Sequence, residues 1–188
     1  LSCADEPDNP MNAAQLATFD RLRAILPAAK ASLANSAGIS LGPKYHFDLV
    51  RPGAALYGIM NTSNQSSPMK QVVNLKGKIL RLRDVDSNLS VGYGASHQVV
   101  KGRYLATVAI GYADGFSRIL SNRATGFVGG KKVSLVGRVS MDLVTFDVTG
   151  APAEFLRPGG DIELIGPGHG VDDLAREAGV DIIMHAWA

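Results

Sequence analysis

After residue 68 the sequence consists of short apolar runs, and this pattern restricts the possible folds more than any other feature. Val, Leu and Ile dominate each run, and Gly, Asp or Asn ends it within a few residues. The clearest runs are VVNLKGKILRLRDV, YLATVAIGYADGF, ATGFVGGKKVSLVGRVSMDLVTFDV and DIELIG. Short β-forming segments separated by turn residues are typical of antiparallel sheets. The pattern predicts an all-β domain over residues 61–188, with one short helix in VDDLAREAGV, where Leu174 and Ala178 share a face.

The first 60 residues have a different periodicity. Apolar side chains recur there at spacings of three and four, which predicts a helix within residues 9–30, with Asn9 as its cap and Pro10 in its first turn. The apolar positions are Leu16, Phe19, Leu22, Ile25 and Leu26. After the apolar run ASLANSAGI, the segment YHFDLVRPGAALYGIM predicts a buried strand that Pro52 ends. Alternation of this kind is typical of the βα units of a parallel α/β fold. About two such units fit before residue 61, so we expect the chain to begin within a fold.

The segment NTSNQSSP, residues 61–68, is polar and has no apolar period, so we expect a linker between the two regions. We expect two domains, residues 1–60 and residues 61–188, with this linker at the start of the second. Of the 188 residues 46% are hydrophobic, which is enough for a buried core. The chain ends at IIMHAWA without a cap or polar tail, so we also expect its C-terminus to be cut or altered.

The charge pattern limits the classes of partner that the protein is expected to bind. Seventeen acidic and nineteen basic residues leave a net charge of +2 without a basic block, so we expect no nucleic-acid partner. No stretch reaches the roughly 20 apolar residues of a membrane span, and the acidic N-terminus is unlike a signal peptide. The single Cys3 cannot form an internal disulfide, which agrees with a reducing compartment. We therefore expect a cytoplasmic protein that does not bind membranes.

Tyr112 lies in GYADG, directly after the apolar run 104–110. A tyrosine at the end of a strand usually packs against its neighbours with its hydroxyl in water. Loops that follow buried strands also present reactive side chains from a rigid scaffold. These five residues alone leave both interpretations open.

Five motifs carry a resemblance to a known family. They are LANSAG (33–38), RPGAALYG (51–58), VGYG (91–94), AIGYADGF (109–116) and GRVSMD (137–142). In this order and spacing they resemble the C-terminal half of bacterial alanine racemase. The resemblance implies a fold-type III enzyme, in which a (β/α)₈ barrel that binds pyridoxal 5'-phosphate is followed by a β domain. Residues 1–60 would then be the end of the barrel, incomplete here, and residues 61–188 the C-terminal β domain.

The resemblance also implies an activity. The family interconverts L-alanine and D-alanine by two-base proton transfer on the cofactor, supplies D-alanine for peptidoglycan, and works as a homodimer with shared active sites. Racemisation needs one proton-transfer group on each face of the α-carbon. The family's Schiff-base lysine serves one face, and the tyrosine that corresponds to Tyr112 serves the other, where it takes the proton of L-alanine. No lysine here lies in a matching motif, nor does a phosphate-binding tyrosine follow Ala188, so we expect the 188 residues alone to be inactive.

The remaining site residues follow from the matched motifs. The resemblance implies that Arg51 faces the pyridine nitrogen of the cofactor, and that Ser36 and the backbone N–H groups of Gly53 and Ala54 bind its phosphate. Ser32 stands where the family usually has a histidine that supports this arginine. We therefore expect weaker support for Arg51, since a serine is shorter.

On the substrate side, the resemblance implies that the N–H of Met141 binds the substrate carboxylate and that Asp142 orients its loop. It also implies that Arg138 lines the entry channel and attracts an anionic substrate. The four histidines have no metal-ligand spacing with one another or with Cys3, so we expect no metal site and place them at the surface or in loops. Two alternatives remain: a stand-alone, non-catalytic truncated domain, or a racemase of another amino acid such as serine.

Overall fold

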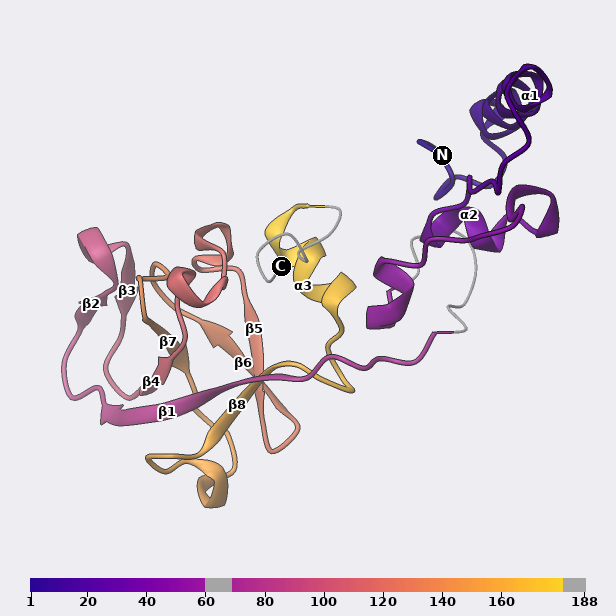
Figure 1. The fold of residues 1–188 in the computed structure, drawn as a ribbon. Coiled ribbons are helices and arrows are strands. Elements are labelled where there is room, and N and C mark those ends of the chain that lie inside the picture. The colour runs from indigo at the N-terminus through magenta and orange to yellow at the C-terminus, as the bar shows by residue number, and fades with distance from the viewer. Residues whose placement is uncertain (60–68, 181–188) are drawn as a thin grey trace. The chain divides into compact units, whose positions relative to one another are not determined.

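The computed structural model describes residues 1–59 and 69–180 (Figure 1). The chain divides into two compact units, Leu1–Val72 and Val73–Ala188. The predicted linker at residues 61–68 lies outside the described residues, and each unit is described by itself below.

In the first unit, helix α1 spans Pro10–Ile25 and begins where the sequence predicts. The side chain of Asn9 accepts a hydrogen bond from the N–H of Met11 at 2.9 Å, which caps the first turn. Phe19 packs edge to face against Phe47, with ring centroids 5.0 Å apart. The short helix α2, Ser36–Ser40, follows. Two 3₁₀ turns complete this unit, at Pro43–Tyr45 and Ala54–Tyr57.

The strand expected before Pro52 is reduced to one pair of residues. Asn35 and Arg51 form an isolated parallel bridge, so the prediction of a buried strand there is wrong in its extent. Upstream of the bridge, the carboxylate of Asp48 accepts the N–H of Ala31 at 2.8 Å. A side chain that takes a backbone donor competes with the strand ladder, and proline has no N–H to extend the ladder. The two segments therefore lie side by side without regular pairing.

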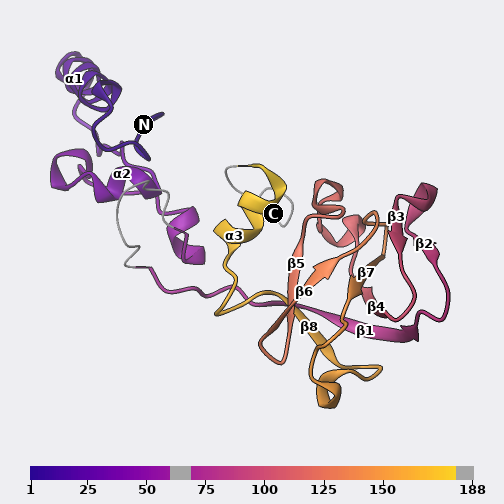
Figure 2. The same ribbon diagram turned by 180° about the vertical axis from the view of Figure 1, so that it is seen from behind.

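The second unit is a closed antiparallel barrel with strand order β1-β4-β7-β6-β5-β8 (Figures 1 and 2). The strands are β1 Leu75–Asp84, β4 Tyr104–Ala109, β5 Thr125–Val128, β6 Lys131–Leu135, β7 Leu143–Asp147 and β8 Asp161–Ile165. A separate hairpin joins β2 Leu89–Val91 to β3 His97–Val99. The one helix in the described part of this unit, α3, spans Val171–Ala178 and buries Leu174 and Ala178 as the sequence predicts. Closure pairs every barrel strand on both sides, so the barrel has no exposed edge.

The core of the barrel consists of alternate side chains from the strands. Phe146, Ile162 and Leu164 are fully buried, and each such side chain stabilises the fold by about 1.5–3 kcal/mol relative to exposure. In β1 the alternation places Ile79 inside, and a β-bulge follows between Ile79 and Arg81. The extra residue at a bulge changes which side chains face inward. The barrel interior is therefore filled, and the functional side chains must lie on its loops.

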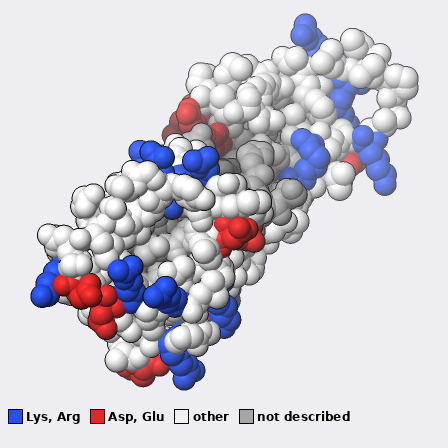
Figure 3. Space-filling view, turned by 90° about the vertical axis from the view of Figure 1, so that its left-hand side faces the viewer, with Lys and Arg blue, Asp and Glu red and all other residues white. Residues whose placement is uncertain are grey.

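Charged side chains of both signs are interspersed over the face drawn in Figure 3. No helix within residues 1–59 and 69–180 is long and apolar enough to cross a membrane.

Candidate functional site

Ser36, Gly53 and Ala54 lie together in the first unit and form what we call the anion cradle. Its available donors are the hydroxyl of Ser36 and the N–H of Ala54, because the N–H of Gly53, expected to bind phosphate, is bonded to Ser36 instead. The hydroxyl oxygen of Ser36 accepts from the N–H groups of Gly53, at 2.9 Å, and Ala55, at 3.2 Å. Its own proton is therefore available for another acceptor. The N–H of Ala54, which lies between the two bonded groups, has no partner in the described part of the chain. The space where Gly53 would carry a Cβ is open. This arrangement suits an anion that accepts several hydrogen bonds.

Arg51 lies directly before the cradle and brings a positive charge. Its Nη1 donates to the hydroxyl of Ser32 at 2.6 Å, and its Nη2 donates to the carbonyl of Leu33 at 3.4 Å. Among the described residues, no carboxylate lies within 4.0 Å of its guanidinium. The shorter serine at position 32 does reach Arg51, so the expected loss of support does not follow. The side chain is exposed, oriented and not neutralised.

Tyr112 lies in the second unit, in a 3₁₀ turn that follows β4. Its N–H donates to the carbonyl of Ser140 at 3.0 Å, and the N–H of Ala113 donates to the carbonyl of Met141 at 2.9 Å. A Cβ on Gly111 would collide with the backbone of Met141, so glycine is required for this close approach. The backbone at Tyr112 is therefore fixed against the 137–142 loop, while the side chain is 43% exposed.

The acidic residue of GYADG has a structural use. The carboxylate of Asp114 accepts the N–H of Gly111 at 2.9 Å and closes the turn. Gly115 then adopts a φ of 88°, a conformation that favours glycine. Phe116 follows and is buried. The motif thus anchors itself on both sides of Tyr112 and leaves the phenol exposed to a ligand.

The 137–142 loop is organised by Ser140. Its hydroxyl donates to the carbonyl of Leu143 at 2.7 Å and accepts the N–H of the same residue at 3.1 Å. The N–H of Met141 has no partner in the described residues and remains available to a ligand. Asp142 is exposed, and no described hydrogen bond involves its side chain, so Ser140 holds this loop here. An orienting role for Asp142 stays a prediction.

Arg138 lines an open cavity of about 360 Å³ beside this loop. The other lining residues are Gly92, Tyr93, Thr107, Ser140, Leu143, Val144 and Thr145. Arg138 is exposed and forms no ion pair with the described carboxylates. The cavity is therefore lined by a cation that no described carboxylate neutralises.

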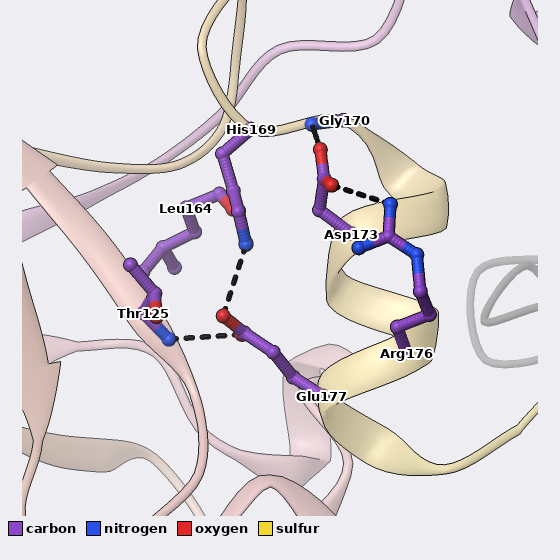
Figure 4. A network of polar contacts seen from close by, with 7 residues as sticks. All are labelled: Thr125, Leu164, His169, Gly170, Asp173, Arg176 and Glu177. Carbon is purple, nitrogen blue, oxygen red and sulfur yellow. Dashed lines mark hydrogen bonds and ion pairs between the residues drawn. The ribbon is translucent and has the colours of Figure 1, made fainter.

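A buried polar network is the feature that the sequence did not predict (Figure 4). His169 lies in a loop, as expected, but its side chain is buried. Its Nδ1 is 2.9 Å from the carbonyl of Leu164 and its Nε2 is 3.2 Å from Glu177, whose other oxygen accepts the N–H of Thr125 at 2.9 Å. A carbonyl can only accept, so Nδ1 carries a proton. Nε2 then faces one oxygen of Glu177, while the other oxygen binds the backbone of Thr125. Glu177 therefore fastens α3 to the start of β5.

The first turn of α3 carries two carboxylates whose pKa values are shifted in opposite directions. Burial raises the pKa of Asp173, but the N–H of Gly170, at 2.7 Å, and the guanidinium of Arg176, at 2.6 Å, outweigh burial and hold its pKa below the usual value. Burial raises the pKa of Asp172; Arg176 opposes this rise and Asp173 adds to it. Asp173 therefore stabilises the helix start as an anion, and Asp172 does not.

Comparison with known proteins identifies the family. Residues 72–183 match the model of the alanine racemase C-terminal domain. The chain belongs to the alanine racemase family. Residues 1–61 match the model of the alanine racemase N-terminal domain. The resemblance predicted from five short motifs is thereby confirmed.

Individual alanine racemases support the same assignment. The chain is 55% identical over 178 residues to an alanine racemase of Rhodospirillum rubrum, covering 95% of this chain and 48% of that protein. It is 45% identical over 190 residues to the biosynthetic alanine racemase of Agrobacterium fabrum, covering 95% of this chain and 49% of that protein. The chain thus spans about half the length of the curated relatives that it matches.

The solved structures give the same result. The alanine racemase of Bartonella henselae, with covalently bound pyridoxal phosphate, has a TM-score of 0.89 and 38% identity, covering 100% of this chain and 52% of that one. The biosynthetic alanine racemase of Pseudomonas aeruginosa has a TM-score of 0.86 and 35% identity, covering 100% and 52%. The predicted fold class, the end of a (β/α)₈ barrel followed by a β domain, is confirmed. The roles of single residues stay predictions.

Proposed function

We propose that this chain is the C-terminal part of a pyridoxal-phosphate-dependent enzyme that interconverts L-alanine and D-alanine. The observation that carries the proposal is Tyr112, whose backbone is fixed by a hydrogen bond to the 137–142 loop while its side chain is 43% exposed. A proton-transfer group needs this combination of a rigid support and an accessible hydroxyl. Membership of the alanine racemase family supplies the reaction that such a tyrosine would serve.

The residues of the first unit fit the cofactor. The anion cradle offers the Ser36 hydroxyl and the free N–H of Ala54 to a phosphate, and Gly53 leaves space for it. Arg51 would face the pyridine nitrogen and, being always protonated, cannot take a proton from it. When bound, pyridoxal phosphate withdraws electrons from the α-carbon of the amino acid and so makes its α-proton more acidic. Arg51 would limit this withdrawal and thereby suppress transamination.

Tyr112 would remove the α-proton of L-alanine through its hydroxyl oxygen. One group cannot both remove a proton from one face and return one to the other, so a second group must serve the opposite face. That group would be the lysine that holds the cofactor, and no lysine within a matched motif of this chain takes the role. We therefore propose that the 188 residues by themselves do not racemise alanine.

The substrate carboxylate would be bound by the N–H of Met141. Arg138 would attract the anionic substrate into the cavity that it lines. Asp142 would orient the loop when substrate is bound. We further propose that the protein is cytoplasmic and forms a homodimer. Residues 1–60 would belong to the barrel of their own subunit. The β domain of residues 61–188 would complete the site in the barrel of the other subunit.

The proposal is tested with the full-length enzyme, meaning these 188 residues joined to the rest of the barrel. Its gene should restore growth of a bacterium that requires D-alanine, and Tyr112→Phe should abolish the rescue. In vitro, the purified enzyme should racemise L-alanine at least tenfold faster than L-serine. Equal or higher activity on L-serine would show that alanine is not the preferred substrate. Full rescue by Tyr112→Phe would show that Tyr112 is not required for the reaction.

Subunit mixing tests the shared site. Subunits that carry Tyr112→Phe are mixed with subunits that lack the cofactor-binding lysine. In a heterodimer with shared sites, one site contains both lesions and the other contains neither, so activity should return on mixing. Heterodimers that form without activity would show that Tyr112 acts within its own subunit or does not act.

A further inference from the structure

We propose that Arg118 is a positioning residue for Tyr112, and this inference rests on the proposed function. Its guanidinium carbon lies 5.5 Å from the centroid of the Tyr112 ring. This distance is within the range of an attractive contact between a cation and an aromatic face. None of the five matched motifs includes Arg118, so sequence comparison by motif did not find it.

Arg118 can interact with the ring because no carboxylate among the described residues pairs with it. In the described part of the chain, no carboxylate lies within 4.0 Å of its guanidinium. Asp114, the acidic residue of the same loop, already accepts the N–H of Gly111. The positive charge of Arg118 is therefore directed at the phenol and not at an ion-pair partner.

The backbone that carries Arg118 is fixed to the same loop as Tyr112. Arg118 begins the 3₁₀ turn Arg118–Leu120, and Leu120 is buried. The hydroxyl of Ser121 donates to the carbonyl of Arg118 at 2.6 Å and accepts the N–H of Val139 at 3.0 Å. Val139 belongs to the 137–142 loop, whose Ser140 carbonyl holds the N–H of Tyr112. The guanidinium and the phenol are thus supported by one loop, so their contact is built into the fold.

The contact has one physical consequence for the Tyr112 side chain. A cation over the ring face restricts rotation of an otherwise exposed tyrosine side chain. This restriction acts on the step in which Tyr112 takes the α-proton of L-alanine. It does not act on the opposite face of the substrate, so the two enantiomers should respond differently.

The test measures α-hydrogen exchange with deuterated solvent under single-turnover conditions in the full-length enzyme. Arg118→Met keeps an unbranched apolar side chain and removes the charge. It should slow exchange from L-alanine three- to tenfold, a change of about 0.7–1.4 kcal/mol in the barrier. Exchange from D-alanine and the half-saturating concentration of substrate should change less than twofold. Arg118→Lys, which restores the charge, should recover at least half of the rate.

Arg123→Met is the matched control, because Arg123 lies five residues after Arg118, is exposed and forms no ion pair with described residues. It should leave both exchange rates unchanged. The inference is overturned if Arg118→Met slows L-alanine exchange less than twofold, slows both enantiomers equally, or acts no differently from Arg123→Met. It is also overturned if Arg118→Lys behaves like Arg118→Met. A Tyr112→Phe enzyme with normal exchange would instead overturn the proposed function itself.

Discussion

Replacing Glu177 with alanine should destabilise the β domain, because two buried polar groups lose their partner. The carboxylate accepts the N–H of Thr125 at 2.9 Å and faces Nε2 of His169 at 3.2 Å, and both partners are less than 7% exposed. A buried donor left without an acceptor costs about 1–3 kcal/mol. The Glu177 side chain is 20% exposed, so water can replace part of the loss. We therefore expect Glu177→Ala to lower the free energy of unfolding by about 2–4 kcal/mol.

Hydrogen exchange measured by mass spectrometry gives the local readout. A loss of about 2 kcal/mol corresponds to roughly 30-fold faster exchange, since 1.4 kcal/mol is a factor of ten. The acceleration should appear at the start of β5, where Thr125 loses its acceptor, and in α3. Urea unfolding of the same protein gives the total change in the free energy of unfolding.

Two variants on the same helix serve as controls. Glu177→Gln keeps an oxygen for Thr125 and should cost less than half as much as Glu177→Ala. Arg176→Ala removes an ion pair whose arginine side chain is 74% exposed, so it should cost less than about 1 kcal/mol. If Glu177→Ala changes stability by less than 0.5 kcal/mol, or no more than Arg176→Ala does, the network does not fasten α3 to the barrel.

Three further outcomes follow from the site and from α3. Asp173 has a lowered pKa in the folded chain, so its contribution is present above its usual value of 3.8 and is lost as the pH falls through the lower folded pKa. Asp173→Asn should therefore lower the free energy of unfolding by about 0.5–1 kcal/mol at pH 7 and leave it unchanged at very low pH. Asp172→Asn should raise the free energy of unfolding at pH 7, because the pKa of Asp172 is shifted in the opposite direction. Urea unfolding at several pH values distinguishes the two variants, and equal effects would contradict the assignment. Gly111→Ala would force apart the backbones of Gly111 and Met141. We expect it to lower the free energy of unfolding by about 1–3 kcal/mol in a denaturation experiment and to lower racemase activity. A variant as active and stable as the parent would refute the close packing. Arg51→Glu in the full-length enzyme should raise the ratio of transamination to racemisation, measured as pyruvate formed per alanine inverted, and an unchanged ratio would remove Arg51 from the cofactor's control.

The sequence predicts the elements of this fold better than their assembly. The cap at Asn9 and the buried face of α3 depend on local spacing, and both are found as predicted. Barrel closure and the bulge in β1 depend on pairing between residues far apart in the chain, which local patterns do not encode. The expected strand before Pro52 is reduced to a single bridge, because the Asp48 side chain accepts the N–H of Ala31, a contact between residues 17 apart that local patterns do not encode either.

The residues of the candidate site also differ in whether the sequence alone can predict them. Tyr112 and Arg51 can be proposed from the sequence because they lie in motifs, and motif spacing is visible in one sequence; their roles stay predictions. His169 and Glu177 meet only when α3 folds back on the start of β5, and a single histidine in a glycine-rich loop gives no sign of burial. Arg118 was missed because a contact between a cation and a ring has no fixed sequence spacing.

The central claim is that Tyr112 removes the α-proton of L-alanine and that another group serves D-alanine. Steady-state rates test this poorly, because a racemase whose two products are equally stable must have the same kcat/KM in both directions. The direct measurement is single-turnover exchange of the α-hydrogen in deuterated solvent with the full-length Tyr112→Phe enzyme. The account predicts that L-alanine retains its α-hydrogen, with exchange slowed by roughly 10²–10⁴, while D-alanine acquires deuterium and stays D-alanine. Equal slowing of both enantiomers, or normal exchange from L-alanine, would contradict it.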